Sequence, residues 1–532
     1  MFTTHFPWLT TIVLFPLLSS LLIPLIPTKE GKNIRTFALG VALADFAIAI
    51  SAFWNNFNLE NTEFQLVDTY SWIPQLGVNW SLGVDGISMP LIVLACFVTT
   101  LAILASWRVK HRPKLFYTLM LVMYAAQIGV LAAKDMFLFF VMWELELVPV
   151  YLLISIWGSE RSRYASTKFI LYNALASIFI LVGALALAFY GDNFTFDIAE
   201  LAAKDYPIGL ATLVYAGFLI AFAVKMPIFP FHTWLPDAHQ ASLAAVSMVI
   251  TGVLKMGSYG LIRYNVEMFP EAHMSFAPVL VILGVVNIVY GAFVAFGQTH
   301  LMRRLAYAAI SHMGFVLIGI GAYTAVGMNG AMLQLISHGL IAAAMFFLAG
   351  VAYKSAGSLW MDKITGLAFE MPKTFALFSI LVMAGVGLPG TSAFVAEITV
   401  FLGMATSDVY STAFKVLVIF LAAVGVIVTP IYFLSTLRVI FYGKNENGFK
   451  VDKYEIDANP REVFIAASII IPVIAVGFYP KLLTNTYDAK TVELANRAQA
   501  VIPVVAQQQE KSVEANLPAP LATEAFIAPT LK

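Results

Sequence analysis

The chain has 532 residues, of which 60% are hydrophobic and only 12% are charged. Soluble domains carry roughly 25% charged residues, so this is the composition of a membrane protein. The 31 basic and 31 acidic residues balance to a net charge of zero, which excludes an electrostatic argument for a nucleic acid partner. The single cysteine, Cys96, excludes an internal disulfide, an iron–sulfur site and a thiolate zinc site. Redox centres are therefore expected outside this chain.

Fourteen segments are long and apolar enough to cross the roughly 30 Å of a bilayer's hydrocarbon, which takes about 20 helical residues. Their centres fall near residues 17, 44, 96, 124, 146, 180, 217, 252, 286, 313, 340, 390, 427 and 471. We therefore predict an all-α polytopic membrane protein. The first segment lacks a basic leader and a cleavage site, so it is predicted as a membrane helix rather than a signal peptide. Residues 481–532 are predicted to form a tail outside the membrane.

The positions of the basic residues support this count. Loops that follow odd-numbered segments hold 20 of the 31 lysines and arginines. Loops that follow even-numbered segments hold only Lys134, Lys204, Arg263 and Lys415. By the positive-inside rule, the amino terminus is predicted on the outer face, and after an even number of crossings the carboxyl terminus lies there too. The acidic, aromatic loop 55–84, which has no lysine or arginine, suits that face.

The fifth segment carries two glutamates, Glu144 and Glu146, in the sequence VMWELELVPVYLL. Glu144 follows Lys134 by ten residues, which places it about 15 Å from the outer end, near the middle of the hydrocarbon. An ionisable residue at this depth is costly and indicates a functional site, the alternatives being a static ion pair or a polar cavity. Glu146 points to a different side of the helix, and for it a structural role is the preferred interpretation.

Lys225 opens the sequence KMPIFPFHTWLPDAH in the seventh segment. Pro227 and Pro230 lack an N–H, so the carbonyls of Ala223 and Met226 lose their helical partners and the helix is predicted to break. Broken membrane helices occur where freed backbone lines a cavity or is buried in protein, as at transporter ion sites. Burial disfavours the charged form of a lysine, which makes Lys225 a candidate proton carrier. The alternative is a lysine that snorkels to the inner surface.

Lys255 lies in the eighth segment, eight residues, or about 12 Å, from the outer end at Arg263. Gly252, Gly257 and Gly260 allow neighbouring helices to approach this part of the segment closely. A proton-carrying lysine is the preferred interpretation, and an ion pair with a static carboxylate is the alternative.

Histidines occur near the middle of the tenth and eleventh segments, at His312 and His338. A histidine titrates near pH 6.5 and both donates and accepts a proton, so a relay is weighed against a hydrogen-bonded structural role. Both interpretations stay open. His232 and His239 flank the break in the seventh segment, where roles as cap or turn residues are predicted.

Glu397 follows a second interruption, at Gly387, Pro389 and Gly390, in the twelfth segment. Matched interruptions beside ionisable residues point to a transporter built from repeats. Lys225 and Glu397 are 172 residues apart, which suggests two five-helix repeats, the second inverted. The predicted boundaries are 1–110 for helices one to three, 111–265 and 266–445 for the two repeats, 446–480 for helix fourteen and 481–532 for the tail.

The run from Lys225 to His239, which includes WLPDA, resembles the signature of the proton-translocating antiporter-like subunits. This family includes large membrane subunits of complex I and subunits of multisubunit sodium/proton antiporters. The resemblance covers roughly residues 80–440. Within it, Glu144 and Lys255, together with Lys225, match the family's glutamate and two lysines.

Glu397 is similar to the M-type, or chain 4, branch of that family, since the other two complex I members usually carry lysine at this break. The leading FPWLTTIVLFPLLSS and the segment SLGVDGIS also resemble chain 4 of cyanobacterial and chloroplast NAD(P)H–quinone oxidoreductases. Ser392 and Ala396 stand where family members often have glycine, which bears on the flexibility of the break but not on Glu397.

The resemblance implies a proton-translocating membrane-arm subunit of an NAD(P)H/ferredoxin–plastoquinone oxidoreductase, a translocase of the thylakoid membrane. The implied partners are other membrane-arm subunits and lipids, with no nucleic acid. No cofactor is expected in this chain, while plastoquinone and iron–sulfur clusters are expected to be bound by other subunits.

The predicted site residues form a chain of proton sites across the middle of the membrane: Glu144, Lys225, Lys255, His312, His338 and Glu397. Protons are expected to enter from the inner side near the lysines, pass the histidines and reach the terminal glutamate. Glu144 is predicted as a switch whose pair with Lys225 keeps the lysine charged. Two unit charges about 7 Å apart at an effective dielectric of about 20 interact by ~2.4 kcal/mol, enough to bias a transfer without blocking it.

Two other functions remain open at this point. One is a sodium/proton antiporter subunit without a redox partner, and the other is a scaffold whose charges are static ion pairs. A self-contained enzyme is not expected, because the sequence has no nucleotide-binding loop and no nucleophile elbow.

Overall fold

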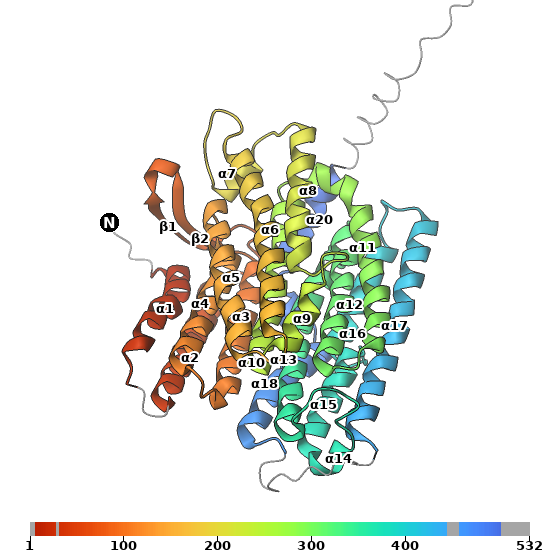
Figure 1. Cartoon of the computed structure of the whole chain (residues 1–532). Coiled ribbons are helices and arrows are strands. Elements are labelled where there is room, and N and C mark those ends of the chain that lie inside the picture. The colour runs from red at the N-terminus through yellow and green to blue at the C-terminus, as the bar shows by residue number, and fades with distance from the viewer. Residues whose placement is uncertain (1–5, 28–30, 444–456, 502–532) are drawn as a thin grey trace, which may run out of the picture.

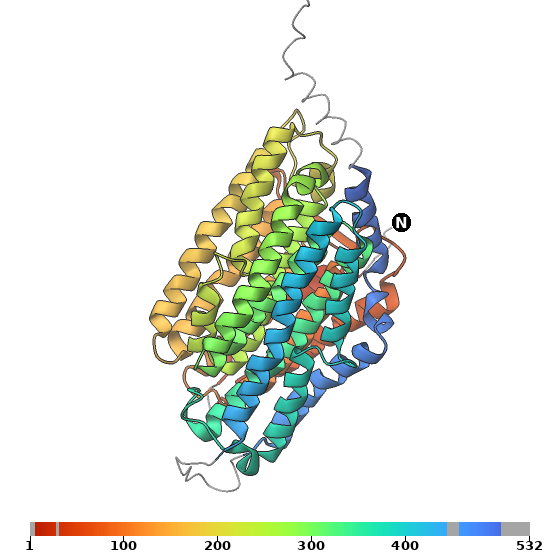
Figure 2. The same cartoon turned by 90° about the vertical axis from the view of Figure 1, so that its right-hand side faces the viewer.

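Long helices make up most of the chain, and the majority of them run roughly parallel to one another (Figures 1 and 2). The computed structural model describes residues 6–27, 31–443 and 457–501. Within these ranges, 13 helices are long and apolar enough to cross a membrane. They are α1 (Trp8–Leu22), α2 (Lys32–Asn56), α3 (Ser88–Ala105), α4 (Pro113–Ala132), α5 (Met136–Trp157), α6 (Ser162–Ala188), α8 (Ile208–Lys225), α10 (Ala244–Gly260), α11 (Pro270–Gly297), α12 (Leu301–Gly321), α13 (Ala325–Ala356), α17 (Thr412–Phe441) and α18 (Pro460–Phe478). Short helical turns extend three of these spans: α1 to Leu25, α3 to Arg108 and α10 to Val266.

The twelfth predicted crossing, centred near residue 390, is the one missing from these 13, and it is divided between two short apolar helices, α15 (Pro372–Gly385) and α16 (Ser392–Ala405). The seventh crossing, α8, ends at Lys225, and the chain resumes as α9 (Trp234–Ala241) after an irregular stretch. Both predicted interruptions are therefore present, and the all-α polytopic class is confirmed. The division into two inverted repeats stays a prediction, which the two matching interruptions favour.

The remaining helical elements are short. They are η1 (Ile23–Leu25), η2 (Pro74–Leu76), η3 (Ser106–Arg108), α7 (Ile198–Ala202), the π-helix η4 (Leu261–Val266), α14 (Leu367–Glu370), α19 (Lys481–Thr484) and α20 (Asp488–Ala500).

The segment 55–84, predicted as a loop, contains an antiparallel hairpin of β1 (Gln65–Ile73) and β2 (Val78–Val84). The extended pairing satisfies backbone groups that a loop would leave to solvent. The Asp68 carboxylate accepts a hydrogen bond of 2.8 Å from the backbone N–H of Thr10, which ties the start of α1 to the hairpin. We call this end of the bundle the hairpin end.

The region 481–532 was predicted to be a tail, and its described part is helical and packed. Helix α20 contacts α11 and α13 at the hairpin end, with Thr491 and Leu494 buried. The start of α1 and helix α20 therefore lie at the same end, as an even number of crossings requires (Figure 1). Residues 502–532 lie outside the described residues, as do the loop residues Lys29, Lys444, Lys450 and Lys453.

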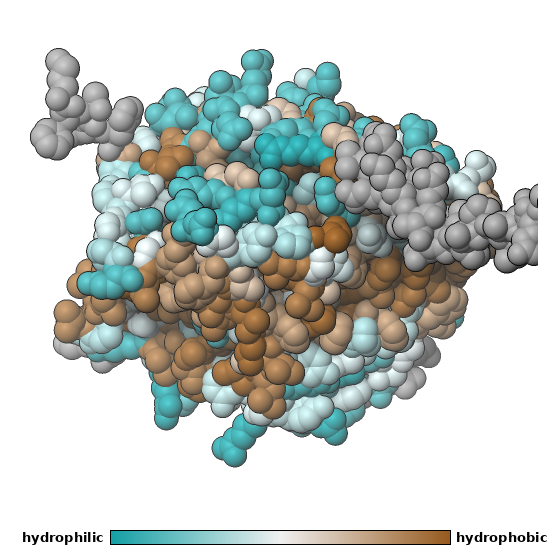
Figure 3. All heavy atoms as spheres, turned by 90° about the horizontal axis from the view of Figure 1, so that it is seen from above, coloured by the Kyte–Doolittle hydropathy of each residue, from teal (hydrophilic) through white to brown (hydrophobic). Residues whose placement is uncertain are grey.

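The most enclosed crossings stand at the centre of the bundle. In the apolar 18-residue stretch of each crossing, every residue of α12 and 94% of the residues of α10 and α13 are buried, compared with 33% for α2. Figure 3, a view from above, shows a broad hydrophobic band on this face with hydrophilic residues on both sides of it. The three central helices carry Lys255, His312 and His338, so the candidate site lies in the interior of the bundle.

Candidate functional site

Lys225 and Glu146 form a buried ion pair. The Lys225 ammonium lies 2.7 Å from Glu146 Oε2, and neither side chain is exposed. The Trp143 ring, one turn before Glu146 on α5, lies 4.7 Å from the same ammonium. A buried charge needs such partners, because an unpaired one would cost several kcal/mol. The snorkelling alternative for Lys225 is thus excluded by its burial.

The predicted pair between Glu144 and Lys225 is wrong, because the carboxylate that contacts the lysine belongs to Glu146. Residues two apart on a helix face different directions, and only position 146 faces α8. Glu144 is half-buried on the other side of α5, and its Oε1 has no hydrogen-bond partner among the described residues. The preferred structural interpretation of Glu146 also changes, since it is the direct partner of the lysine.

The break after Lys225 is stabilised by a backbone hydrogen bond of its own and by one side chain from another helix. The Ala223 carbonyl, predicted to lose its partner, accepts a bond from the Ile228 N–H at 2.8 Å. Farther along, Asn287 on α11 accepts from the Phe229 N–H at 2.8 Å and donates to the Pro227 carbonyl at 3.3 Å. Backbone freed within a membrane must be satisfied in this way. Asn287 therefore positions the segment that follows Lys225.

Replacing Asn287 with alanine is expected to destabilise the assembled protein by about 1–3 kcal/mol, since the N–H of Phe229 and the carbonyl of Pro227 lose their partner. The change would appear as a lower temperature of thermal unfolding in detergent. Asn173→Ala is the matched control, because Asn173 is also buried but donates only to Phe169 within its own helix. Equal effects of the two changes would contradict the assigned role of Asn287.

Lys255, His338, His312 and Glu397 follow one another in space as a continuous row. Lys255 Nζ lies 2.8 Å from His338 Nδ1, and the His338 and His312 ring centres are 5.8 Å apart. His312 Nδ1 lies 3.4 Å from Glu397 Oε1. All four side chains are at least 90% buried. The structure thus brings together four predicted site residues and places His338 between Lys255 and His312.

A small cavity of about 10 Å³, lined by residues of α3, α4, α10 and α13, lies beside Lys255. Thr99, Gln127 and Thr251 are its polar residues, and neither Thr99 Oγ1 nor Gln127 Oε1 has a hydrogen-bond partner among the described residues. Unpaired polar atoms around such a volume fit roughly one buried water. The cavity therefore has room for about one water beside Lys255.

The second break also places a charged side chain against irregular backbone. Gly387 has a positive φ of 78°, and a Cβ on this residue would lie 3.0 Å from Glu397 Oε2. Glycine is needed here because its missing side chain leaves room for the carboxylate. Ser392, which departs from the family pattern, begins α16 and hydrogen-bonds Ser337 at 2.7 Å. The break is present despite the serine.

The Lys225 and Lys255 sites meet where α10 packs against the end of α8. A Cβ on Gly257 would lie 2.7 Å from the Met226 nitrogen and 3.0 Å from Lys225 Cβ, so only glycine permits this approach. Among the described residues, no hydrogen bond or ion pair joins Lys225 to Lys255. A proton passing between them requires water or side-chain movement.

The two other histidines lie apart from this row. His232 lies in the break, with Nε2 3.2 Å from the Tyr290 hydroxyl. His239 lies inside α9 rather than at its cap, and its ring stacks on Phe346 with centres 4.0 Å apart.

Several buried polar residues were not given a functional role from the sequence, among them Glu146, Asn287 and Asp45. Glu146 was set aside as structural, while Asn287 in α11 and Asp45 in α2 were not considered. Both Asp45 oxygens are buried with no hydrogen-bond partner among the described residues. A single polar residue within an apolar segment was the available signal for Asn287 and Asp45.

Comparisons with known proteins show the family to which the chain belongs. A family model described as NADH:quinone oxidoreductase/Mrp antiporter, TM, matches residues 133–425, and one described as NADH-ubiquinone oxidoreductase chain 4, amino terminus, matches residues 10–133. A chain named NAD(P)H-quinone oxidoreductase chain 4 from Nostoc sp. is 59% identical over 99% of this chain and 97% of its own length. The chain belongs to the chain 4 family of NAD(P)H-quinone oxidoreductases.

Other relatives of this chain 4 member are similar to it in sequence or in fold. A chain 4 from Picosynechococcus sp. is 62% identical over 94% of both chains. A chain of the respiratory complex I from Thermus thermophilus is 27% identical, with a TM-score of 0.82 over 92% of this chain and 99% of that one. A chain of the Mrp complex from Dietzia sp. is 20% identical, with a TM-score of 0.78 over 96% and 57%, which shows a shared fold.

Proposed function

We propose that this chain 4 member moves protons through Lys225, Lys255, His338, His312 and Glu397, as a membrane-arm subunit of a complex I-type oxidoreductase. The observation that carries the proposal is the buried row from Lys255 to Glu397. A row of groups that both accept and donate protons, closed off from lipid, is the arrangement a proton relay requires.

The Lys225–Glu146 pair acts as the switch in this proposal. At 2.7 Å and an effective dielectric of about 20, the two charges attract each other by ~6 kcal/mol. That attraction exceeds the ~2.4 kcal/mol expected for the wider pair predicted from sequence. The closed pair therefore holds the proton on Lys225, and a charge or conformational change must open it. Glu144 lies near enough to act electrostatically on Glu146 and is the side chain through which such a change would act.

From Lys255 the proton passes to His338, with which it shares a contact of 2.8 Å. The step from His338 to His312 covers rings 5.8 Å apart, which a ring rotation or one bridging water spans. His312 then delivers the proton to Glu397, 3.4 Å away. Uptake occurs from the basic inner side, and the hairpin end faces the lumen or periplasm.

The driving reaction belongs to other subunits. As part of a translocase, this chain has membrane-arm subunits and lipids around it, while iron–sulfur clusters and the reduced quinone are bound elsewhere in the complex. The relatives from Nostoc sp. and Picosynechococcus sp. are named NAD(P)H-quinone oxidoreductase chain 4. We propose plastoquinone as the quinone, the thylakoid as the membrane, and NAD(P)H or ferredoxin as the electron donor. An iron–sulfur peripheral arm is expected to co-purify with the chain in mild detergent. Its absence, together with sodium-dependent transport by the reconstituted chain, would favour the antiporter alternative.

Glu397→Gln is expected to stop proton delivery at the end of the row while leaving the fold intact, because glutamine keeps the size and polarity of the side chain. Protons moved per electron would be measured in vesicles that contain the assembled complex, together with the rate of quinone reduction. A positioned proton carrier contributes about 10²–10⁴-fold to a transfer rate, so the contribution of this subunit should vanish. Unchanged proton stoichiometry would remove Glu397 from the route.

A further inference from the structure

A line of polar side chains leads from Lys255 to the hairpin end. Tyr259, Arg263 and Glu267 follow Lys255 at successive four-residue intervals, which places them on one face over about 18 Å of helix. The contacts agree, since Arg263 Nε lies 3.3 Å from the Tyr259 hydroxyl and Arg263 Nη1 lies 2.6 Å from Glu267 Oε2. The π-helix η4 falls within this line. π turns are rare in proteins as a whole, and those that occur are frequently found at functional sites.

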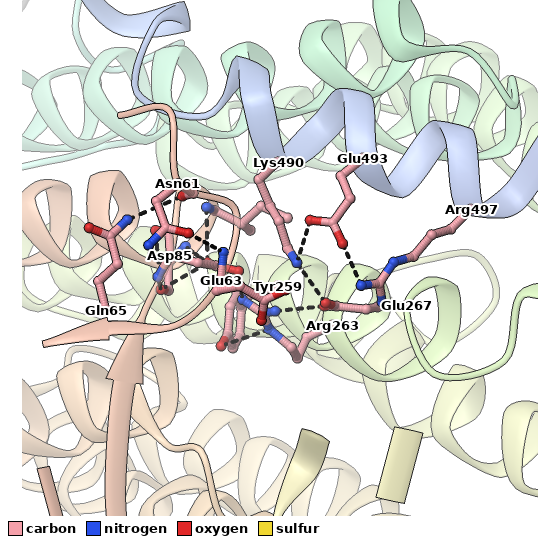
Figure 4. A network of polar contacts seen from close by, with 12 residues as sticks. Asn61, Glu63, Gln65, Asp85, Tyr259, Arg263, Glu267, Lys490, Glu493 and Arg497 are labelled. Carbon is pink, nitrogen blue, oxygen red and sulfur yellow. Dashed lines mark hydrogen bonds and ion pairs between the residues drawn. The ribbon is translucent and has the colours of Figure 1, made fainter. Parts of the chain in front are cut away.

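The line ends in a connected network of ion pairs (Figure 4). Arg263, only 1% exposed, pairs with Asp85 at 2.6 Å in addition to Glu267. Lys490 on α20 lies 2.9 Å from Glu267 Oε1 and 3.1 Å from Glu493. Both oxygens of Glu267 are therefore held by cations, one from the bundle and one from α20. Arg497 completes the network by pairing with Glu493. The network then has three positive and three negative groups: Arg263, Lys490, Arg497, Asp85, Glu267 and Glu493.

Helix α20 is built into the end of the bundle. A Cβ on Gly86 would lie 2.9 Å from the Thr486 carbonyl and 3.2 Å from Lys490 Cβ, so the turn after β2 fits directly under this helix. Burial on its own raises the pKa of Asp85, but the charges of Arg263 and Lys490 outweigh it and hold that pKa below its usual value. The carboxylate thus stays ionised and bound to its partners.

We propose that Arg263, fixed by Asp85 and Glu267, closes the hairpin end of the Lys255 line to protons, and that α20 locks this closure through Lys490. A fixed guanidinium in a narrow path raises an electrostatic barrier to protons. The neighbouring carboxylates cannot relay a proton while each is bound to a cation. The closure directs a proton on Lys255 toward His338 rather than straight out of the bundle. This inference rests on the proposed role of Lys255.

Two single changes test the closure in the assembled complex reconstituted into phospholipid vesicles. Lys490→Gln and Glu267→Gln each weaken the lock without removing Arg263. With no electron donor present, either variant is expected to dissipate an imposed pH gradient about tenfold faster, equal to ~1.4 kcal/mol lost from the barrier. During turnover, protons moved per electron should fall while quinone reduction continues. Lys481→Gln, at an exposed lysine on α19, is the matched control and should leave both quantities unchanged.

A gradient that decays at the wild-type rate in an assembled variant overturns the closure. If neither variant assembles, Arg497→Gln decides on the same measurements, because Arg497 is 49% exposed and only loosens Glu493. Adding Lys255→Ala to Lys490→Gln tests the line itself, since the extra leak should disappear. A leak that persists overturns the assignment of the line. The proposed function fails separately, if Lys255→Ala alone pumps normally.

Discussion

Lys225→Ala is expected to abolish proton transfer through this chain and to destabilise it by about 3–5 kcal/mol, because it leaves the Glu146 carboxylate buried and unpaired. Glu146→Gln should have an effect of similar size, since it strands the ammonium instead. Protons moved per electron and the temperature of thermal unfolding of the assembled complex measure the two effects.

Glu144→Gln is the matched control for stability, because Glu144 is half-buried and makes no ion pair with any residue that the structure describes. It should cost less than about 1 kcal/mol and affect pumping only through its charge on Glu146. A larger loss of stability from Glu144→Gln than from Glu146→Gln would contradict the observed pairing.

The double variant Lys225→Met/Glu146→Leu separates a switch from a scaffold. Removing both charges relieves the burial penalty, so much of the lost stability should return. Pumping should stay lost if the pair acts as a switch. Full pumping by the double variant would instead support a scaffold with static ion pairs.

His338→Gln is expected to interrupt the relay at its centre and to slow proton transfer about 10²–10⁴-fold, because glutamine hydrogen-bonds Lys255 but neither gains nor loses a proton near neutral pH. Quinone reduction should continue in the same preparation, with fewer protons moved per electron.

His273→Gln provides the control for this change. His273 is equally buried in α11 and hydrogen-bonds the Tyr215 hydroxyl at 2.8 Å, away from the row. The substitution His273→Gln should lower the stability about as much as His338→Gln does but leave pumping unaltered. Equal losses of pumping in both variants would show that burial of a histidine, rather than its place in the row, is what matters.

Much of the fold could be predicted because its signals are local. Hydrophobic length identifies a membrane span, and the prolines near Lys225 and the glycines before Glu397 interrupt helices through their own backbone chemistry. The hairpin at 65–84 was missed, because pairing between its strands depends on contacts that composition does not report. The packing of α20 was missed for the same reason, since its polar sequence gave no sign of the ion pairs with Glu267 and Glu493.

The sequence by itself determined the membrane class, the count of crossings and the two breaks. It also placed ionisable residues within the crossings: Lys225, Lys255, His312, His338 and Glu397. Only the tertiary structure decided which side chains meet. Glu144 and Glu146 have the same chemistry and lie two residues apart, so the choice between them depends on how α5 is rotated against α8. Packing of the whole bundle fixes that rotation, and no local signal carries it.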